Sequence, residues 1–310
     1  MPTESELAAS LRAAETRLFE RYGLSHTERF VEVDGTSVRV VEVPATDPTR
    51  TPVLLLHGIA SVTAAAVPLI PAFDGARIIA IDWPGHGLSG PYRFTPRGDL
   101  RDFAERFIDA VADDAGLSSF DLVGHSLGGQ FALYYCLTRS DRVRRLLLLG
   151  APGAAFRELN PPTSMRVVAF PGIGRRLLAR VVSLEQYRAN SAMTLGAGTV
   201  DPWPSELVEV GWYASQRHAF VDTLPGLFRC LASIFGVRRS AVIPHETLAT
   251  ITLPTLLVWG TLDVFVSPED ARPSWSRMPG AALADIEGAG HAPWLNDLEQ
   301  SAAAVRRFLA

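Results

Sequence analysis

A glycine–serine–glycine pattern in the middle of the chain is the feature best suited to covalent chemistry. Gly124, Ser126 and Gly128 are separated by single residues, and they follow an apolar run at residues 120–123 that predicts a buried strand. A run at residues 130–137 predicts a helix directly after them. Small residues on both sides allow a sharp turn from strand to helix, and such a turn presents the serine hydroxyl as a nucleophile.

A serine hydroxyl is a weak nucleophile at neutral pH, so it needs a base and a group that orients that base. Asp263 and His291 follow Ser126 in the chain, each in a loop after a predicted strand. Because the carboxyl ends of parallel strands meet at one edge of a sheet, these loops are expected to converge. We expect Ser126 to be the nucleophile, His291 the base and Asp263 the orienting acid. The alternative acids are Asp82 and Asp285.

An ester or amide carbonyl attacked by serine becomes an oxyanion, which needs hydrogen-bond donors aimed at it. The backbone N–H of Leu127, directly after the nucleophile, is one expected donor. We expect the second to be the backbone N–H of Ile59, in the loop after a predicted strand at residues 52–56. The side chain of His57 in the same loop is expected to have a structural role.

Predicted strands alternate with predicted helices, which indicates an α/β fold with a mostly parallel sheet and helices on both faces. Asp34-Gly35, between two apolar runs, predicts an antiparallel hairpin at the N-terminal side. Strand signals stop between Pro152 and about Pro244, where a helical insertion is predicted. The expected divisions are an N-terminal helix with its lead-in, a core in two segments and the insertion: residues 1–28, 29–152 with 245–310, and 153–244.

The insertion is rich in apolar and aromatic residues that suit a substrate pocket. Its most regular feature is an apolar face that predicts one helix. The residues on that face are Leu224, Leu227, Phe228, Leu231 and Phe235. Three side chains inside and outside the insertion are expected to contact the substrate: His125, Trp212 and Trp294.

Composition limits the class of protein. The 310 residues are 47% hydrophobic and 20% charged, which fits one large α/β domain. The net charge of −4 gives no basic surface for nucleic acid, and no apolar run approaches the ~20 residues of a membrane span. Cys136 and Cys230 lie in unrelated helical patterns, so no disulfide is expected. We expect a cytoplasmic monomer or homodimer that acts on a small molecule.

The residues that could form a metal site are His57, Asp82, His86, His125 and His291. No pair of them has the short spacing of zinc ligands. The chain also has no phosphate-binding glycine loop after a strand. Neither a metal nor an organic cofactor is therefore expected.

As a set, these motifs resemble the α/β-hydrolase superfamily. The likeness runs from about Phe30 to the C-terminus and is closest to the capped single-chain enzymes, namely esterases, proline iminopeptidases and meta-cleavage-product hydrolases. The resemblance implies a Ser-His-Asp triad and a cap formed by the insertion. The motifs that carry it are His57-Gly58, Asp82-x-Pro84-Gly85-His86-Gly87-x-Ser89, Gly124-His125-Ser126-Leu127-Gly128-Gly129, Gly260-x-x-Asp263 and Gly290-His291.

The resemblance leaves three functions to weigh. The first is hydrolysis of small to medium, largely apolar carboxylic esters through an acyl-enzyme. The second is C–C bond hydrolysis of the meta-cleavage type, which is disfavoured because Ala292, and not an aromatic residue, follows His291. The third is a non-catalytic ligand receptor on the same fold, which has no need of all three triad residues. Dehalogenases and epoxide hydrolases of the family carry Asp where this chain has Ser126.

Overall fold

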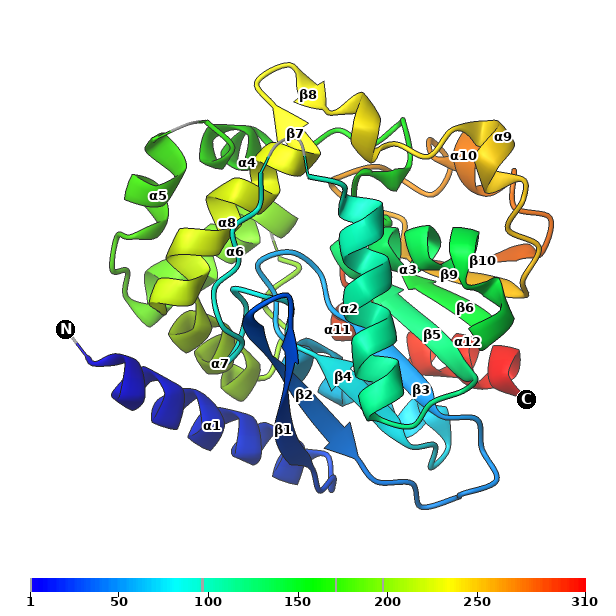
Figure 1. The fold of residues 1–310 in the computed structure, drawn as a ribbon, viewed down its shortest axis with the longest axis horizontal. Helices are drawn as coiled ribbons and strands as arrows, with labels where there is room; N and C mark the ends of the chain where they lie inside the picture. Colours follow the sequence, from blue (N-terminus) through cyan, green and yellow to red (C-terminus); the bar gives the residue numbers. More distant parts are fainter. Residues whose placement is uncertain (1, 96–97, 171, 197) are drawn as a thin grey trace.

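The computed structural model describes residues 2–95, 98–170, 172–196 and 198–310. In this part of the chain, eight strands form one sheet in the order β1-β2-β4-β3-β5-β6-β9-β10 (Figure 1). β1 pairs antiparallel with β2, and β2 with β4, whereas every other pair in the sheet is parallel. The predicted fold class is confirmed. The strands are β1 (Thr27–Val33), β2 (Thr36–Val43), β3 (Val53–Leu56), β4 (Ile78–Ile81), β5 (Phe120–His125), β6 (Val143–Leu149), β9 (Thr255–Gly260) and β10 (Ala281–Ile286).

The turn between β1 and β2 has the geometry that its two residues favour. Asp34 and Gly35 have φ angles of 51° and 76°. Two positive φ angles in succession match the right-handed twist of the flanking strands, so Asp-Gly is a preferred pair for such a turn. Val33 accordingly pairs with Thr36, and the predicted hairpin is confirmed.

The central strands are buried on both faces, and this explains their continuous apolar sequences. In β3, Leu54 and Leu56 belong to a core cluster with α2 and α3, whereas Val53 and Leu55 belong to a cluster with η1 and α12.

None of the helices described here is both long and apolar enough to cross a membrane. The elements around the sheet are η1 (Thr63–Phe73), α2 (Leu100–Asp114), α3 (Leu127–Thr138), η2 (Ser140–Arg142), η3 (Gly153–Ala155), η4 (Arg239–Ala241), α9 (His245–Leu248), α10 (Arg272–Trp275), α11 (Pro293–Asn296) and α12 (Leu298–Leu309).

Helices dominate residues 163–231, after β6, and in Figure 1 these helices lie to one side of the sheet. A short hairpin, β7 paired with β8, follows them, although the sequence predicted no strand here. Phe235 was expected on the helical face that ends in α8, but it lies in this hairpin and is 92% exposed. Gly236 has φ of 117°, which a helix does not allow. The elements are α4 (Thr163–Val168), α5 (Ile173–Leu178), α6 (Leu184–Leu195), α7 (Ser205–Ser215), α8 (His218–Leu231), β7 (Ala232–Ser233) and β8 (Gly236–Val237).

The N-terminal helix α1 (Glu4–Arg21) lies along α7 of the insertion (Figure 1). Its first turn is closed by a capping box between Thr3 and Glu6. Arg17 of α1 forms an ion pair with Glu209 of α7 at 2.5 Å. The helix also buries an apolar face in the core, so it connects the sheet with the insertion. The buried apolar residues of α1 are Leu7, Leu11, Ala14, Leu18 and Phe19.

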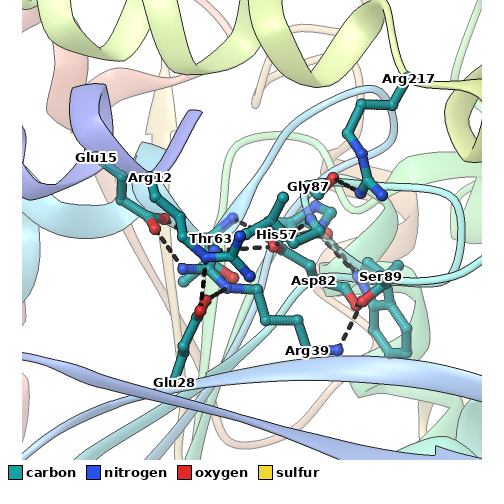
Figure 2. A network of polar contacts seen from close by, with 12 residues as sticks. Arg12, Glu15, Glu28, Arg39, His57, Thr63, Asp82, Gly87, Ser89 and Arg217 are labelled. Carbon is teal, nitrogen blue, oxygen red and sulfur yellow. Dashed lines mark hydrogen bonds and ion pairs between the residues drawn. The ribbon is translucent and has the colours of Figure 1, made fainter. Parts of the chain in front are cut away.

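A buried ionic network joins α1 to the sheet (Figure 2). Arg39 of β2 is 1% exposed and binds Glu15 of α1, which is equally buried. The guanidinium also lies 2.6 Å from Glu28 of β1 and 3.2 Å from Asp82, which follows β4. Burial by itself would raise the pKa of Asp82, but Arg39 and two backbone N–H donors outweigh it and lower that pKa to about 2. The Asp82 carboxylate is therefore held charged at neutral pH.

Replacing Arg39 with methionine leaves Glu15 and Asp82 as uncompensated buried carboxylates. We expect Arg39→Met to lower the free energy of unfolding by about 3–5 kcal/mol, measured by urea denaturation. Arg12→Met is the matched control, because Arg12 also binds Glu28 but is 44% exposed. Arg12→Met should lower the free energy of unfolding by less than about 1 kcal/mol. Equal losses in the two variants would contradict the buried network as a source of stability.

Candidate active site

Ser126 stands on a strained turn between β5 and α3. Its backbone has φ of 52° and ψ of −116°, a conformation that costs energy for any residue with a side chain. The surrounding backbones approach closely: a Cβ at Gly124 would lie 2.5 Å from the carbonyl oxygen of Gly128. A Cβ at Gly128 would lie 2.1 Å from that of Leu56. Only glycine fits these two positions, and the turn that they allow fixes the direction of the serine side chain.

Asp263 and His291 meet at the carboxyl end of the sheet. Nδ1 of His291 lies 2.8 Å from Oδ2 of Asp263. The carboxylate accepts three further hydrogen bonds of 3.0 Å, from the backbone N–H groups of Ala151 and Phe265 and from the indole N–H of Trp259. Because an ionised carboxylate only accepts, Nδ1 of His291 carries a proton. The neutral ring then has Nε2 as its free acceptor.

The imidazole of His291 is confined as well as oriented. The ring of Phe265 packs on it at a centroid distance of 4.2 Å. A Cβ at Gly150 would lie 2.3 Å from the His291 carbonyl oxygen, so the backbones are in contact there. Within the described residues, Nε2 of His291 is buried and has no hydrogen-bond partner. His291 and Ser126 border the same cavity, and Ser126 is 7% exposed.

The two alternative acids lie elsewhere. Asp82 is bound to Arg39 and to the backbone N–H groups of Thr63 and Leu88. Asp285 is an exposed residue of β10. Neither forms a hydrogen bond or an ion pair with His291 among the described residues. The structure thus brings Asp263, and not the alternatives, to the histidine.

The loop after β3 is held by two histidines. Nδ1 of His57 donates to the Gly58 carbonyl at 2.7 Å, and its Nε2 accepts from the backbone N–H of Trp83 at 3.1 Å. Nε2 of His86 accepts from the backbone N–H of Ala60 at 3.1 Å. The sequence showed His86 as a candidate metal ligand and as part of a family motif, but this role in the loop was not predicted. The sequence feature that could have indicated this structural role is the position of His86 between Gly85 and Gly87, in a tight turn.

Ile59 and Leu127, the expected oxyanion donors, lie beside Ser126. All three residues border one small cavity. Leu127 is the first residue of α3, so its N–H has no acceptor within the helix. A Cβ at Gly58 would lie 3.0 Å from the Ser126 Cβ, which shows how closely the loop before Ile59 approaches the serine. Both expected donors therefore belong to residues that border the cavity at Ser126.

Two cavities meet at Ser126. The larger has a volume of about 320 Å³ and lies between the core and the insertion. The smaller has a volume of about 40 Å³. Of the three expected substrate contacts, His125 and Trp294 border the larger cavity, with ring centroids 4.8 Å apart. Both belong to the core, and the ring centroid of His125 lies 4.9 Å from that of His291.

Trp212, the third expected contact, does not border either cavity. Its indole N–H donates to the Val182 carbonyl at 2.8 Å, and its ring packs against Tyr213. Helix α7 presents a different face to the cavity, with residues spaced three and four apart. That face comprises Leu207, Val208, Gly211 and Ser215.

Burial keeps three histidines near the site neutral. It lowers the pKa of His57 and of His125, the latter well below its usual range. It also lowers the pKa of His86, to about 3. The acceptor roles of His57 and His86 in the loop after β3 require this neutral form.

These histidines predict acid sensitivity of the fold. Unfolding exposes each one to water, where it binds a proton below about pH 6.5, so the unfolded state gains protons and stability falls as pH decreases from about 6.5 towards 3. Between about pH 6 and 5, His86, whose pKa is about 3 in the folded protein, contributes a slope of up to ~1.4 kcal/mol per pH unit. We expect His86→Asn to reduce the slope of unfolding free energy against pH by that amount, measured by urea denaturation. His218→Asn, at an exposed histidine, should leave it unchanged; equal slopes in all three proteins would contradict the interpretation.

Comparisons with known proteins agree with this architecture. The family model described as "alpha/beta hydrolase fold" matches residues 51–297. A pimeloyl-[acyl-carrier protein] methyl ester esterase from Xanthomonas campestris is 27% identical over 263 residues, 83% of this chain and 94% of the relative. A 2-hydroxy-6-oxononadienedioate/2-hydroxy-6-oxononatrienedioate hydrolase from Cupriavidus pinatubonensis is 26% identical, over 86% and 90% of the two chains.

Among solved structures, a carboxylesterase from Bacillus subtilis superimposes with a TM-score of 0.74. The match covers 98% of this chain and 99% of that one at 19% identity, so it bears on the fold alone. The family model spans most of the sheet, the serine turn and the loops of Asp263 and His291. The chain belongs to the alpha/beta hydrolase fold family.

Proposed function

We propose that this protein is a serine hydrolase that cleaves carboxylic esters through an acyl-enzyme. The observation that carries the proposal is the state of His291, whose Nδ1 is fixed by Asp263 while its buried Nε2 has no partner among the described residues. His291 and Ser126 border the same cavity. A base with this orientation is what an unactivated serine requires.

The proposed reaction has two halves. Oγ of Ser126 attacks the ester carbonyl and its proton passes to Nε2 of His291, while Asp263 stabilises the imidazolium. The oxyanion accepts hydrogen bonds from the N–H groups of Ile59 and Leu127. The ester C–O bond then breaks, and His291 gives its proton to the departing alkoxide. Water, deprotonated by His291, attacks the acyl-enzyme, and release of the carboxylic acid restores Ser126.

In this proposal the helical insertion is a cap over the reacting groups. Helices α5, α6 and α7 of the insertion contribute walls of the larger cavity opposite Ser126 and His291. A largely apolar wall excludes water from the carbonyl and strengthens the hydrogen bonds to the oxyanion. It also favours substrates whose uncharged parts can be buried.

Ser126→Ala tests the nucleophile. We expect the folded wild-type protein to react covalently with a fluorophosphonate probe at Ser126 and to hydrolyse aryl esters. The alanine variant should lose labelling and at least about a thousandfold in kcat, because the acyl-enzyme cannot form. Intact mass spectrometry and release of the phenol measure the two effects. A wild-type protein that folds but is neither labelled nor active on esters, or that turns over only a chromogenic C–C hydrolase dienoate, contradicts the proposal.

Asp263→Asn tests the orienting acid. An amide can donate as well as accept, so it favours the histidine tautomer with the proton on Nε2, where it blocks the base. We expect kcat to fall by about 10³–10⁴-fold with little change in KM. Asp285→Asn is the matched control, because Asp285 is an exposed carboxylate in the strand before His291. Similar losses in the two variants would contradict the assignment.

A further inference from the structure

The two cavities at Ser126 differ in size, and each borders a different part of the reacting groups. The larger has a volume of about 320 Å³ and borders His291. The smaller, with a volume of about 40 Å³, borders Leu127 but, among the described residues, not His291. This inference rests on the proposed function, because it assigns the two halves of an ester to the two cavities.

The chemistry of the leaving group determines that assignment. The departing alkoxide takes its proton from Nε2 of His291, so it must lie on the side of the serine that faces the histidine. The alcohol half therefore occupies the larger cavity. The carbonyl oxygen is directed to the N–H groups of Ile59 and Leu127. The remaining substituent, the acyl chain, then extends into the smaller cavity beside Leu127.

The volume of the smaller cavity limits the acyl chain. A water-sized atom occupies ~10–15 Å³ by the same measure, so the cavity holds roughly three heavy atoms beyond the carbonyl. Its walls are almost wholly apolar. The side chains that form them come from the core and the insertion: Leu159, Met165, Phe228, Leu231, Val237 and Phe265. An acid with a second charged or polar end is not accommodated there.

We propose that the substrates are esters of short, unbranched carboxylic acids, from acetic to butanoic acid, with larger apolar alcohols. The volume beside His291 is several times that beside Leu127. The asymmetry predicts a preference for orientation: a bulky group is accepted on the alcohol side and rejected on the acyl side.

A pair of isomeric esters tests this preference in the wild-type protein. Benzyl acetate carries its ring on the alcohol, whereas methyl phenylacetate carries it on the acid, and the two alcohols are similarly weak acids. For each ester, kcat/KM reports the steps up to formation of the acyl-enzyme, so the two values compare how well each ester is acylated onto the enzyme. We expect kcat/KM for benzyl acetate to be at least about tenfold higher, the discrimination of a tight apolar pocket. Equal values or the reverse order would overturn the proposal.

Two variants change the smaller cavity in opposite directions, with p-nitrophenyl esters keeping the alcohol constant. Leu159→Ala widens it and is expected to raise kcat/KM for the hexanoyl ester about tenfold relative to the acetyl ester. Val237→Phe fills it and should lower the butanoyl-to-acetyl ratio by a similar factor. Leu177→Ala makes the same deletion in the larger cavity and should leave the acyl-length ratios as in the wild type. Because each readout is a ratio on one protein, a general loss of folding does not imitate it.

The outcomes separate this inference from the function on which it rests. Absence of both ester hydrolysis and labelling of Ser126 contradicts the proposed function. Ester hydrolysis with labelling, but with octanoyl esters cleaved as fast as acetyl esters or with ratios insensitive to Leu159 and Val237, leaves the function standing and overturns the assignment of the cavities.

Discussion

The close approach of three backbones at the end of β5 is the constraint on which the site depends. Gly124, Gly128 and the carbonyl of Leu56 lie so near one another that no side chain fits between them. This contact holds Ser126 at φ of 52°, because relaxing the turn would separate α3 from the sheet. The packing of the central strands on both faces supplies the stability that offsets the strain. The packing of the core and the geometry of the serine turn therefore depend on the same contact.

Behind the serine, a second layer of buried polar groups fixes the loop after β3. Asp82 binds Arg39 on one side and the N–H of Thr63 on the other, and it lies 3.8 Å from Nε2 of His57. His57 in turn holds Trp83 and its own loop. Glu15 connects this network to α1 (Figure 2). Helix α1 and the loop after β3 are thus linked by a short chain of buried polar side chains.

Much of the core followed from local sequence patterns. Continuous apolar runs predicted the buried strands, Asp34-Gly35 predicted the hairpin, and the order of strands predicted which loops would meet at Ser126. The directions of side chains in the insertion were not predictable in this way. Whether Trp212 enters the cavity depends on the rotation of α7, which is set by its packing on α1 and not by its own sequence. The Arg39 network was also missed, because residues distant in the chain give no local sign that their charges are buried together.

Some ion-pair partners of α1 lie far along the chain and are synthesised much later than the helix itself. Arg39, the partner of Glu15, is made early, but Glu209, the partner of Arg17, is made 192 residues after that arginine. Arg217, which binds both Glu4 and the carbonyl of Gly87, comes later still. While a ribosome completes the insertion, α1 therefore has only one of its two docking surfaces. Helix α1 is made before the other elements described here but is among the last to be fully in place, so its order of synthesis and its order of assembly are opposite.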